Sequence, residues 1–494
     1  MKKIIALFIL VIMMFPMFAC VDKNKANETT TKTDDTTIYA PSTVDENGYL
    51  LDDLSPDLDY NGNSVGILYW NDVEHTEFEV EEISGDLVDD AIFNRNSQVE
   101  KRLNVSLDYY GIAGNVYNIS PFVSHVQTMI TSGDTSYDII GSYSSTGGTL
   151  AYNGLVADLL EIDNLNFSQP WWPDELISTS TLNGHLYFCS GDISTNMLHM
   201  MYAAFFNKDY LDTYNIDSPY TFVDNGTWTF EVFDKMATGI YGDLNGDSIK
   251  DDGDRYGYET YWLHLDGLFG SVGIKSVEKD ENDLLVISPT YGDAKVQTFL
   301  EYLNSHFASS NDWYYVGDSG TDGKTQQTIF AEGRSLFMTE RVRVCQNVLR
   351  FTELNYGILP IPKYDETQQN YITTMAMPYT LYTVPKNVSD SARAGAVLEC
   401  LASEGYRTVT PALFEVAMKT RYSSDDVSSR MYNIIRDNVT FDLGRIFNES
   451  LGKIPNATLR SMVNAGSSTW TSKYNSLEKS LNSYIDKINL SLEK

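Results

Sequence analysis

Cysteine and positive charge are both scarce in this sequence of 494 residues. It contains four cysteines, and its 35 Lys and Arg residues face 68 Asp and Glu residues, which gives a net charge of -33. Such an excess of negative charge argues strongly against nucleic acid and anionic lipid surfaces as binding partners. Beyond Cys20 only Cys189, Cys345 and Cys400 remain. An odd, sparse set does not make a disulfide framework, so we expect free, buried thiols.

Familiar catalytic motifs are also lacking. The sequence has no HExxH, GxSxG or Walker A pattern, and its six histidines are scattered without zinc-like spacing. A glycosidase that uses two carboxylates stays open, because 68 acidic residues supply many pairs. The aromatic content of 13% indicates a globular chain, and its length favours two lobes.

One long apolar run lies at the N-terminus. Lys2 and Lys3 precede the wholly apolar stretch 4–15, and this layout is typical of a signal peptide. The apolar stretch is too short for a comfortable membrane-spanning helix. Met17-Phe-Ala-Cys20 follows and resembles the lipobox of bacterial lipoproteins, with Met17 in place of the usual Leu. The resemblance implies that Cys20 carries a diacylglycerol, whereas the alternative is an ordinary cleavable signal with an incidental Cys.

The segment after Cys20 is polar and rich in Thr, Asp, Asn and Lys up to about residue 41. It has too few apolar residues to offset the conformational entropy that folding costs. We therefore expect a signal peptide over 1–19, and a lipidated Cys with a flexible linker over 20–60 whose last part is a frayed junction with the fold. No second hydrophobic stretch of spanning length follows, so we expect membrane attachment through the lipid anchor only.

The chain after the linker alternates strand and helix patterns. The expected strands are 65–70, 104–109 and 137–141, and the expected helices are 87–103, 122–132 and an amphipathic one from residue 474. This alternation predicts an α/β fold with largely parallel strands.

Several blocks resemble, in order, the extracellular solute-binding proteins of sugar ABC importers, which are maltose-binding-protein-like, and especially their large lipoprotein subgroup in Gram-positive bacteria. The blocks are GDLVDDAIFNRNSQVEKRLNV, SYDIIGSYSSTGGTLAYNGLVADL, YAAFFNKDYLDTYNI, FAEGRSLFMTERV, LNYGILPIPKYDETQQNY and YTLYTVPKN. The resemblance implies a two-lobed periplasmic-binding-protein type II fold with a hinge between the lobes. We expect an N-terminal lobe over 61–197 and 355–400, and a C-terminal lobe over 198–354 and 401–494.

The same resemblance implies a monomeric receptor that captures a sugar in an interlobe cleft and delivers it to the permease subunits of an ABC transporter. Such a cleft needs aromatic platforms for sugar faces and planar polar groups for hydroxyls. The candidate substrate-binding residues are Trp70, Tyr143, Asp192, Trp262, Glu340 and Arg341. The alternative for each aromatic residue is plain core packing, and for the Glu340–Arg341 pair it is a surface ion pair.

One acidic loop has the ligand spacing of a calcium site. Oxygen ligands fall at loop positions 1, 3, 5, 9 and 12, and the backbone carbonyl of Ile249 falls at position 7; the residues are Asp243, Asn245, Asp247, Ile249, Asp251 and Asp254. The loop departs from an EF-hand at positions 6 and 12 and looks more like the dockerin type. We expect structural Ca²⁺ here, and the alternative is a polar surface turn without metal.

The sequence therefore predicts a lipid-anchored solute-binding protein on the extracellular face of the cell membrane, with no enzymatic activity. Two alternatives stay open. One is a surface glycan-binding lipoprotein without a permease, and the other is a secreted glycoside hydrolase.

Overall fold

The structure is a computed structural model that describes residues 43–72, 77–317, 324–419 and 426–493. A compact unit begins at Val44 and includes both sheets of the fold. Within the described ranges, no helix combines the length and the apolar character that a bilayer crossing requires.

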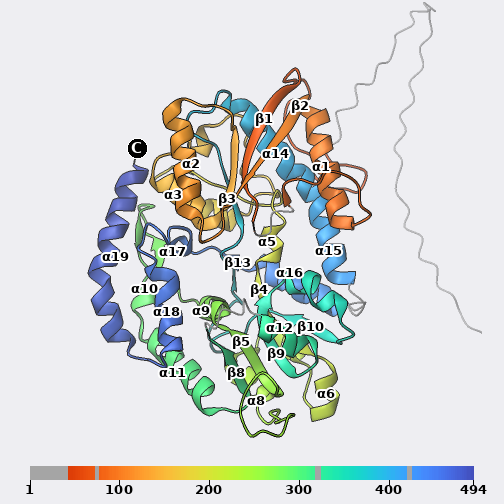
Figure 1. Ribbon diagram of the computed structural model, residues 1–494, viewed down its shortest axis with the longest axis vertical. Helices are drawn as coiled ribbons and strands as arrows, with labels where there is room; N and C mark the ends of the chain where they lie inside the picture. Colours follow the sequence, from red (N-terminus) through yellow and green to blue (C-terminus); the bar gives the residue numbers. More distant parts are fainter. Residues whose placement is uncertain (1–42, 73–76, 318–323, 420–425, 494) are drawn as a thin grey trace, which may run out of the picture. The chain divides into compact units, whose positions relative to one another are not determined.

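The first lobe contains a four-stranded sheet with the order β12-β3-β1-β2. Figure 1 shows β3, β1 and β2 side by side. β1 is parallel to both β2 and β3, and β12 joins β3 in the antiparallel direction; the strands are β1 (Asn63–Trp70), β2 (Val105–Ile112), β3 (Ile139–Tyr143) and β12 (Thr380–Thr383). The accompanying helices are α1 (Leu87–Leu103), α2 (Ile119–Ser132), α3 (Ser144–Tyr152), η2 (Leu159–Glu161), α4 (Asp174–Ser180), α14 (Ser391–Glu404), the π-helical turn η5 (Gly405–Val409) and α15 (Thr410–Lys419).

Helix α1 shows how the sequence sets these boundaries. The carboxylate of Asp86 accepts the backbone N–H groups of Val88 and Asp89 at 3.0 and 3.3 Å, which caps the helix start. Asn104 ends it in the left-handed conformation, at φ 51°. The apolar side chains that face the core recur every three to four residues or at multiples of that spacing; they are Val88, Ile92, Val99 and Leu103.

The second lobe contains a five-stranded sheet with the order β10-β4-β9-β5-β8. Its strands are β4 (Tyr202–Asn207), β5 (Tyr256–Tyr261), β8 (Trp313–Val316), β9 (Ser335–Arg341) and β10 (Tyr356–Leu359). Its helices are α6 (Asp209–Tyr214), α7 (Pro219–Asp224), α8 (Phe230–Ala237), η3 (Trp262–His264), α9 (Leu265–Ser271), α10 (Pro289–Gly292), α11 (Ala294–Ser309), α12 (Lys324–Ala331), α13 (Val344–Asn347), η4 (Leu349–Phe351) and α16 (Asp426–Asp437). Two small strand pairs complete the described strands: β6 (Val277–Lys279) with β7 (Leu285–Ile287), and β11 (Thr373–Thr374) with β13 (Val439–Thr440).

Two chain segments that pass between the sheets lie side by side. The first contains α5 (Asn196–His199) and leads into β4, and the second leads from β10 through β11 to β12. Antiparallel bridges join them at Cys189 with Tyr382 and at Met201 with Met375. The candidate site is built around these crossing segments.

The last three helices contact elements of both lobes; they are α17 (Leu443–Ile446), α18 (Ile454–Asn464) and α19 (Trp470–Leu492). Helix α17 packs on α3 and on β6, and α18 packs on α9 and η3. Helix α19 packs on α3, α11 and β7 through a buried apolar stripe that consists of Leu481, Ile485, Ile488 and Leu492. Side chains from the end of the chain therefore reach the region where the lobes connect.

Most of the predicted elements are confirmed, including the helix over 87–103 at both ends. Asn104, which the sequence analysis placed in a strand, instead ends α1, because its amide side chain tolerates the left-handed conformation. Cys189, Cys345 and Cys400 are free and buried, as expected.

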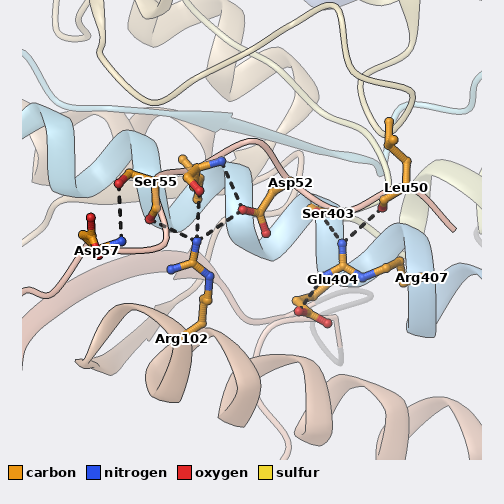
Figure 2. A network of polar contacts seen from close by, with 9 residues as sticks. Leu50, Asp52, Ser55, Asp57, Arg102, Ser403, Glu404 and Arg407 are labelled. Atoms are coloured by element: carbon orange, nitrogen blue, oxygen red, sulfur yellow. Dashed lines mark hydrogen bonds and ion pairs between the residues drawn. The ribbon is translucent and has the colours of Figure 1, made fainter. Parts of the chain in front are cut away.

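Two further chain segments pack on the first lobe. The π-helical turn η5 and α15 (405–419) contact α1. The lobe limits, with 401–494 in the C-terminal lobe, stay a prediction. The part of the predicted linker from Val44 to Tyr60 packs on the fold through Leu54, which is 8% exposed, and through hydrogen bonds to its backbone carbonyls (Figure 2).

Candidate functional site

The carboxyl ends of β1 and β3 meet at one edge of the first sheet. Trp70 ends β1 and Tyr143 ends the neighbouring parallel strand β3. Their rings contact edge to face, with centroids 5.7 Å apart. Trp70 is fully buried and donates its indole N–H to the Thr380 hydroxyl at 3.0 Å. Trp70 therefore supports Tyr143 from the core.

Trp262 lies at the carboxyl end of β5 in the second lobe, half-buried at the start of η3. The guanidinium carbon of Arg460, from α18, lies 4.6 Å from the centroid of its ring. The indole Nε1 is buried, and no described residue accepts its hydrogen bond. A buried donor without a partner costs about 1–3 kcal/mol, so a water or a ligand that accepts from this N–H would stabilise the site.

Asp266, one helical turn after Trp262, joins two arginines. Its carboxylate lies 2.6 Å from Nη1 of Arg445 and 3.4 Å from Nε of Arg460. Arg445 also donates to the carbonyl of Met375 in the second crossing segment, at 3.2 Å. Burial alone would lower the pKa of the Arg445 guanidinium, but the charge of Asp266 raises it above its ordinary value, so the arginine stays charged.

Tyr143 from the first lobe and Tyr202 from the second lobe lie near the charges of Asp266, Arg445 and Arg460. Burial raises the pKa of both phenols, and the charges of Arg445, Arg460 and Asp266 act on both. Tyr202, at the start of β4, donates its hydroxyl to the Leu263 carbonyl at 3.1 Å, next to Trp262. We call the six residues the Trp262 cluster: Tyr143, Tyr202, Trp262, Asp266, Arg445 and Arg460.

A second contact set holds the same place together. Ser144, which follows Tyr143, donates its hydroxyl to the Met377 carbonyl at 2.6 Å. The Met377 sulfur in turn lies 3.4 Å from the amide nitrogen of Asn456 in α18. The first lobe, a crossing segment and a C-terminal helix therefore meet at the cluster.

Glu340 and Arg341 lie at the end of β9, where Arg341 is in register with Tyr202. Glu340 is 1% exposed, so the pair is not on the surface; its carboxylate lies 3.1 Å from His264 Nε2 and 3.0 Å from Arg341 Nε. Burial would raise the pKa of Glu340, but His264 and Arg341 more than offset this effect and lower it. Burial also lowers the pKa of His264. Glu340 thus holds His264 at the end of η3, two residues after Trp262.

Asp192 lies apart from the cluster. Its carboxylate accepts the Thr410 hydroxyl at 2.5 Å, and burial raises its pKa to about 6. Its backbone N–H donates to the Trp171 carbonyl at 3.0 Å. These contacts hold the first crossing segment against the first lobe.

A narrow pocket of about 40 Å³, partly open to solvent, adjoins the cluster. Asp266 and Arg445 line it, together with Lys275, Tyr291, Thr374 and Asp442. It lies where α9, β11, β13, α17 and α18 come together. The pocket has room for a few water molecules beside the salt bridge of the cluster.

The predicted calcium loop is closed by its own hydrogen bonds. The Asp243 carboxylate accepts the N–H groups of Gly246 and Ser248 at 2.6 and 3.0 Å, and the buried Asp254 accepts the Tyr241 hydroxyl at 3.0 Å. In the described ranges, no three His, Cys, Asp or Glu side chains lie close enough to hold one metal ion. Calcium binding stays a prediction, and Cys20 lies outside the described residues.

Sequence reasoning missed Tyr202, Asp266, Arg445 and Arg460. Each lies far along the chain from Tyr143, and only the fold brings them together. A signal was present for Arg460, a lone charge within the otherwise uncharged stretch of α18.

Comparisons with known proteins identify the fold. No family model matches the chain, and no curated protein matches it in sequence. Solved structures do match over most of its length, and they place the chain in the two-lobed periplasmic-binding-protein fold, which confirms the predicted fold class.

Three of these structures show the extent of the likeness. UspC of M. tuberculosis has a TM-score of 0.55 and 12% identity, and the match covers 87% of this chain and 100% of that one. A cyclo/maltodextrin-binding protein in complex with maltotetraose has a TM-score of 0.54 and 10% identity, with 88% and 99% covered. MalX from Streptococcus pneumoniae, in complex with maltopentaose, has a TM-score of 0.51 and 15% identity, with 86% and 100% covered.

Proposed function

We propose that this protein is an extracellular solute-binding protein that captures a carbohydrate between its two lobes and delivers it to an ABC permease. The observation that carries the proposal is the Trp262 cluster, where an indole ring, two guanidinium groups and a carboxylate meet. Aromatic faces pack on the apolar faces of sugar rings, and guanidinium and carboxylate groups bond vicinal hydroxyls.

Two further observations support it. The cluster draws side chains from both lobes and from the C-terminal helices, the arrangement that lobe closure on a ligand requires. Two structures of the same fold, at 10% and 15% identity, were solved with maltotetraose and maltopentaose bound. Carbohydrate is therefore the ligand class to test first.

The test is a thermal-shift screen of the chain from residue 44 against monosaccharides, oligosaccharides and short peptides. A ligand at a hundredfold excess over its dissociation constant stabilises the folded state by about 2.7 kcal/mol. We expect a rise in melting temperature with one class of saccharide. A rise with peptides alone would contradict the proposal, and cleavage of an oligosaccharide during the assay would replace it by a hydrolase.

We also propose that Cys20 carries the lipid that holds the protein on the outer face of the membrane. The Cys20→Ala variant should then appear in the culture medium, whereas the wild-type protein stays with the membrane fraction. Equal retention of both proteins after washing with high salt would contradict lipidation.

A further inference from the structure

The Trp262 cluster carries hydrogen-bond donors that the chain itself does not use. The buried Nε1 of Trp262 has no acceptor among the described residues. The Nε of Arg460 donates to the Asn456 carbonyl at 2.6 Å. No described residue accepts a hydrogen bond from its two terminal nitrogens. Its side chain is only 11% exposed. Indole and guanidinium nitrogens can only donate, so their missing partner is an acceptor.

The charge around these donors is positive in a chain whose net charge is -33. Arg445 and Arg460 share a single carboxylate, that of Asp266. The pocket that Asp266 and Arg445 line also has Lys275 and Asp442 in its wall, so the cluster and this pocket together hold three cations and two carboxylates even when Asp442 is counted as ionised. A largely buried cation without a full counter-charge is costly, and a ligand anion would complete the set.

The neighbouring ionisable groups do not cancel this excess. Glu340 is taken up by Arg341 and His264, which lie 3.0 and 3.1 Å from its carboxylate. Tyr143 and Tyr202 stay protonated because burial raises their pKa values. The positive charge at Arg460 therefore remains available to a ligand.

We infer that the ligand of the Trp262 cluster is an acidic saccharide whose carboxylate binds Arg460 and the indole N–H of Trp262 while a sugar ring packs beside them. This inference rests on the proposed function and narrows its substrate class to uronates. A carboxylate matches the planar donor fork of a guanidinium in a way that a single hydroxyl does not.

The experiment is isothermal titration calorimetry with trimeric uronates of galacturonate, mannuronate and guluronate, each paired with its fully methyl-esterified form. The ester keeps the sugar and removes the charge. We expect at least one acid to bind at least about tenfold more tightly than its own ester, since a charge-assisted hydrogen bond is about twice as strong as a neutral one. Neutral glucose and galactose trimers complete the panel.

Variants assign the preference to Arg460. Arg460→Gln should bring the acid-to-ester ratio close to one, and Arg460→Lys, which keeps the charge but loses the fork, should retain part of it. Arg430→Gln is the matched control, because Arg430 is an exposed arginine of α16 paired with Asp224 at the surface. It should leave the ratio unchanged, and circular dichroism melts establish that each variant is folded.

The outcomes separate this inference from the function on which it rests. If neutral trimers or esters bind as tightly as every acid, or if the acid preference survives Arg460→Gln, the uronate inference is wrong and the carbohydrate receptor stands. If no saccharide of either kind binds to the folded protein, the proposed function is wrong, and the inference is overturned with it.

Discussion

Glu399 in α14 is a buried carboxylate held by tryptophans. Its two oxygens accept the indole N–H groups of Trp171 and Trp172 at 2.9 and 3.0 Å, and one also accepts the Asn166 backbone N–H at 3.1 Å. Burial raises its pKa to about 7 in spite of these bonds. Trp171 and Trp172, adjacent in sequence, thus take structural positions in the first lobe, and the tryptophan that we propose to contact the sugar is Trp262.

The raised pKa of Glu399 predicts a pH dependence of stability. The folded protein keeps a proton that the unfolded chain releases between about pH 4.5 and 7. The stabilisation from this group is therefore complete below about pH 4.5 and is lost as the pH rises through about 7. The upper limit of this stabilisation is about 3 kcal/mol, because the pKa of Glu399 rises from 4.5 to about 7.

Urea unfolding at pH 5 and pH 7.5 measures this effect. Glu399→Gln should flatten the decline in the free energy of unfolding between the two pH values. Glu281→Gln, at an exposed position, should follow the wild-type protein. Parallel pH profiles for the wild-type protein and the Glu399→Gln variant would show that Glu399 does not titrate in this range.

At the scale of elements, the segment from Val44 to Tyr60 is held by two arginines (Figure 2). Arg102 of α1 donates to the carbonyls of Leu54 and Ser55, each at 3.2 Å. Arg407 donates to the Leu50 carbonyl at 3.3 Å and to Glu404 at 2.6 Å. The segment thus packs against the α1 and α14–η5 region.

Truncation tests the role of this segment. A chain that begins at residue 61 should melt several degrees below one that begins at residue 44, because it loses the burial of Leu54 and exposes its contact surface. A chain that begins at residue 21 should melt together with the one from residue 44. Differential scanning calorimetry of the three proteins measures this, and equal melting of all three would contradict a stabilising role.

The acidic loop after α8 gives the second prediction at this scale. If the loop binds Ca²⁺, Asp243→Ala combined with Asp247→Ala should lower the melting temperature in calcium and leave it unchanged in chelator, because the carboxylates repel one another without the ion. A double exposed substitution outside the loop, Asp280→Ala with Asp283→Ala, is the control. Equal melting of the loop variant and the wild-type protein in calcium would mean that the loop holds no metal.

Local patterns in the sequence predict the elements well, and long-range contacts explain what they miss. The apolar spacing and the caps of α1 are local, so its two ends follow from the sequence. The Val44–Tyr60 segment has a polar composition that indicates a linker, and its anchors Arg102 and Arg407 lie far along the chain. No local pattern connects them.

On the scale of the whole molecule, the order of the blocks predicts the two-lobed fold but not the composition of the site. Tyr143 and Trp262 lie at the carboxyl ends of β3 and β5, where a ligand cleft of an α/β sheet is expected. Both were predicted from the sequence as substrate-binding residues. Asp266, Arg445 and Arg460 complete the cluster from α9, α17 and α18. These contacts depend on where the C-terminal helices pack against the two lobes. The apolar periodicity and the motif spacing of the sequence do not predict this packing.

The most direct test of sugar binding at the Trp262 cluster is calorimetric titration of the best saccharide from the thermal screen into the wild-type protein and into the Trp262→Phe and Trp262→Ala variants. We expect Trp262→Phe to weaken binding several-fold through loss of the unpaired N–H, and Trp262→Ala to weaken it by at least about tenfold. Both variants should stay folded, because Trp262 is only half-buried. Unchanged affinity in the folded Trp262→Ala variant would contradict the placement of the sugar at the Trp262 cluster.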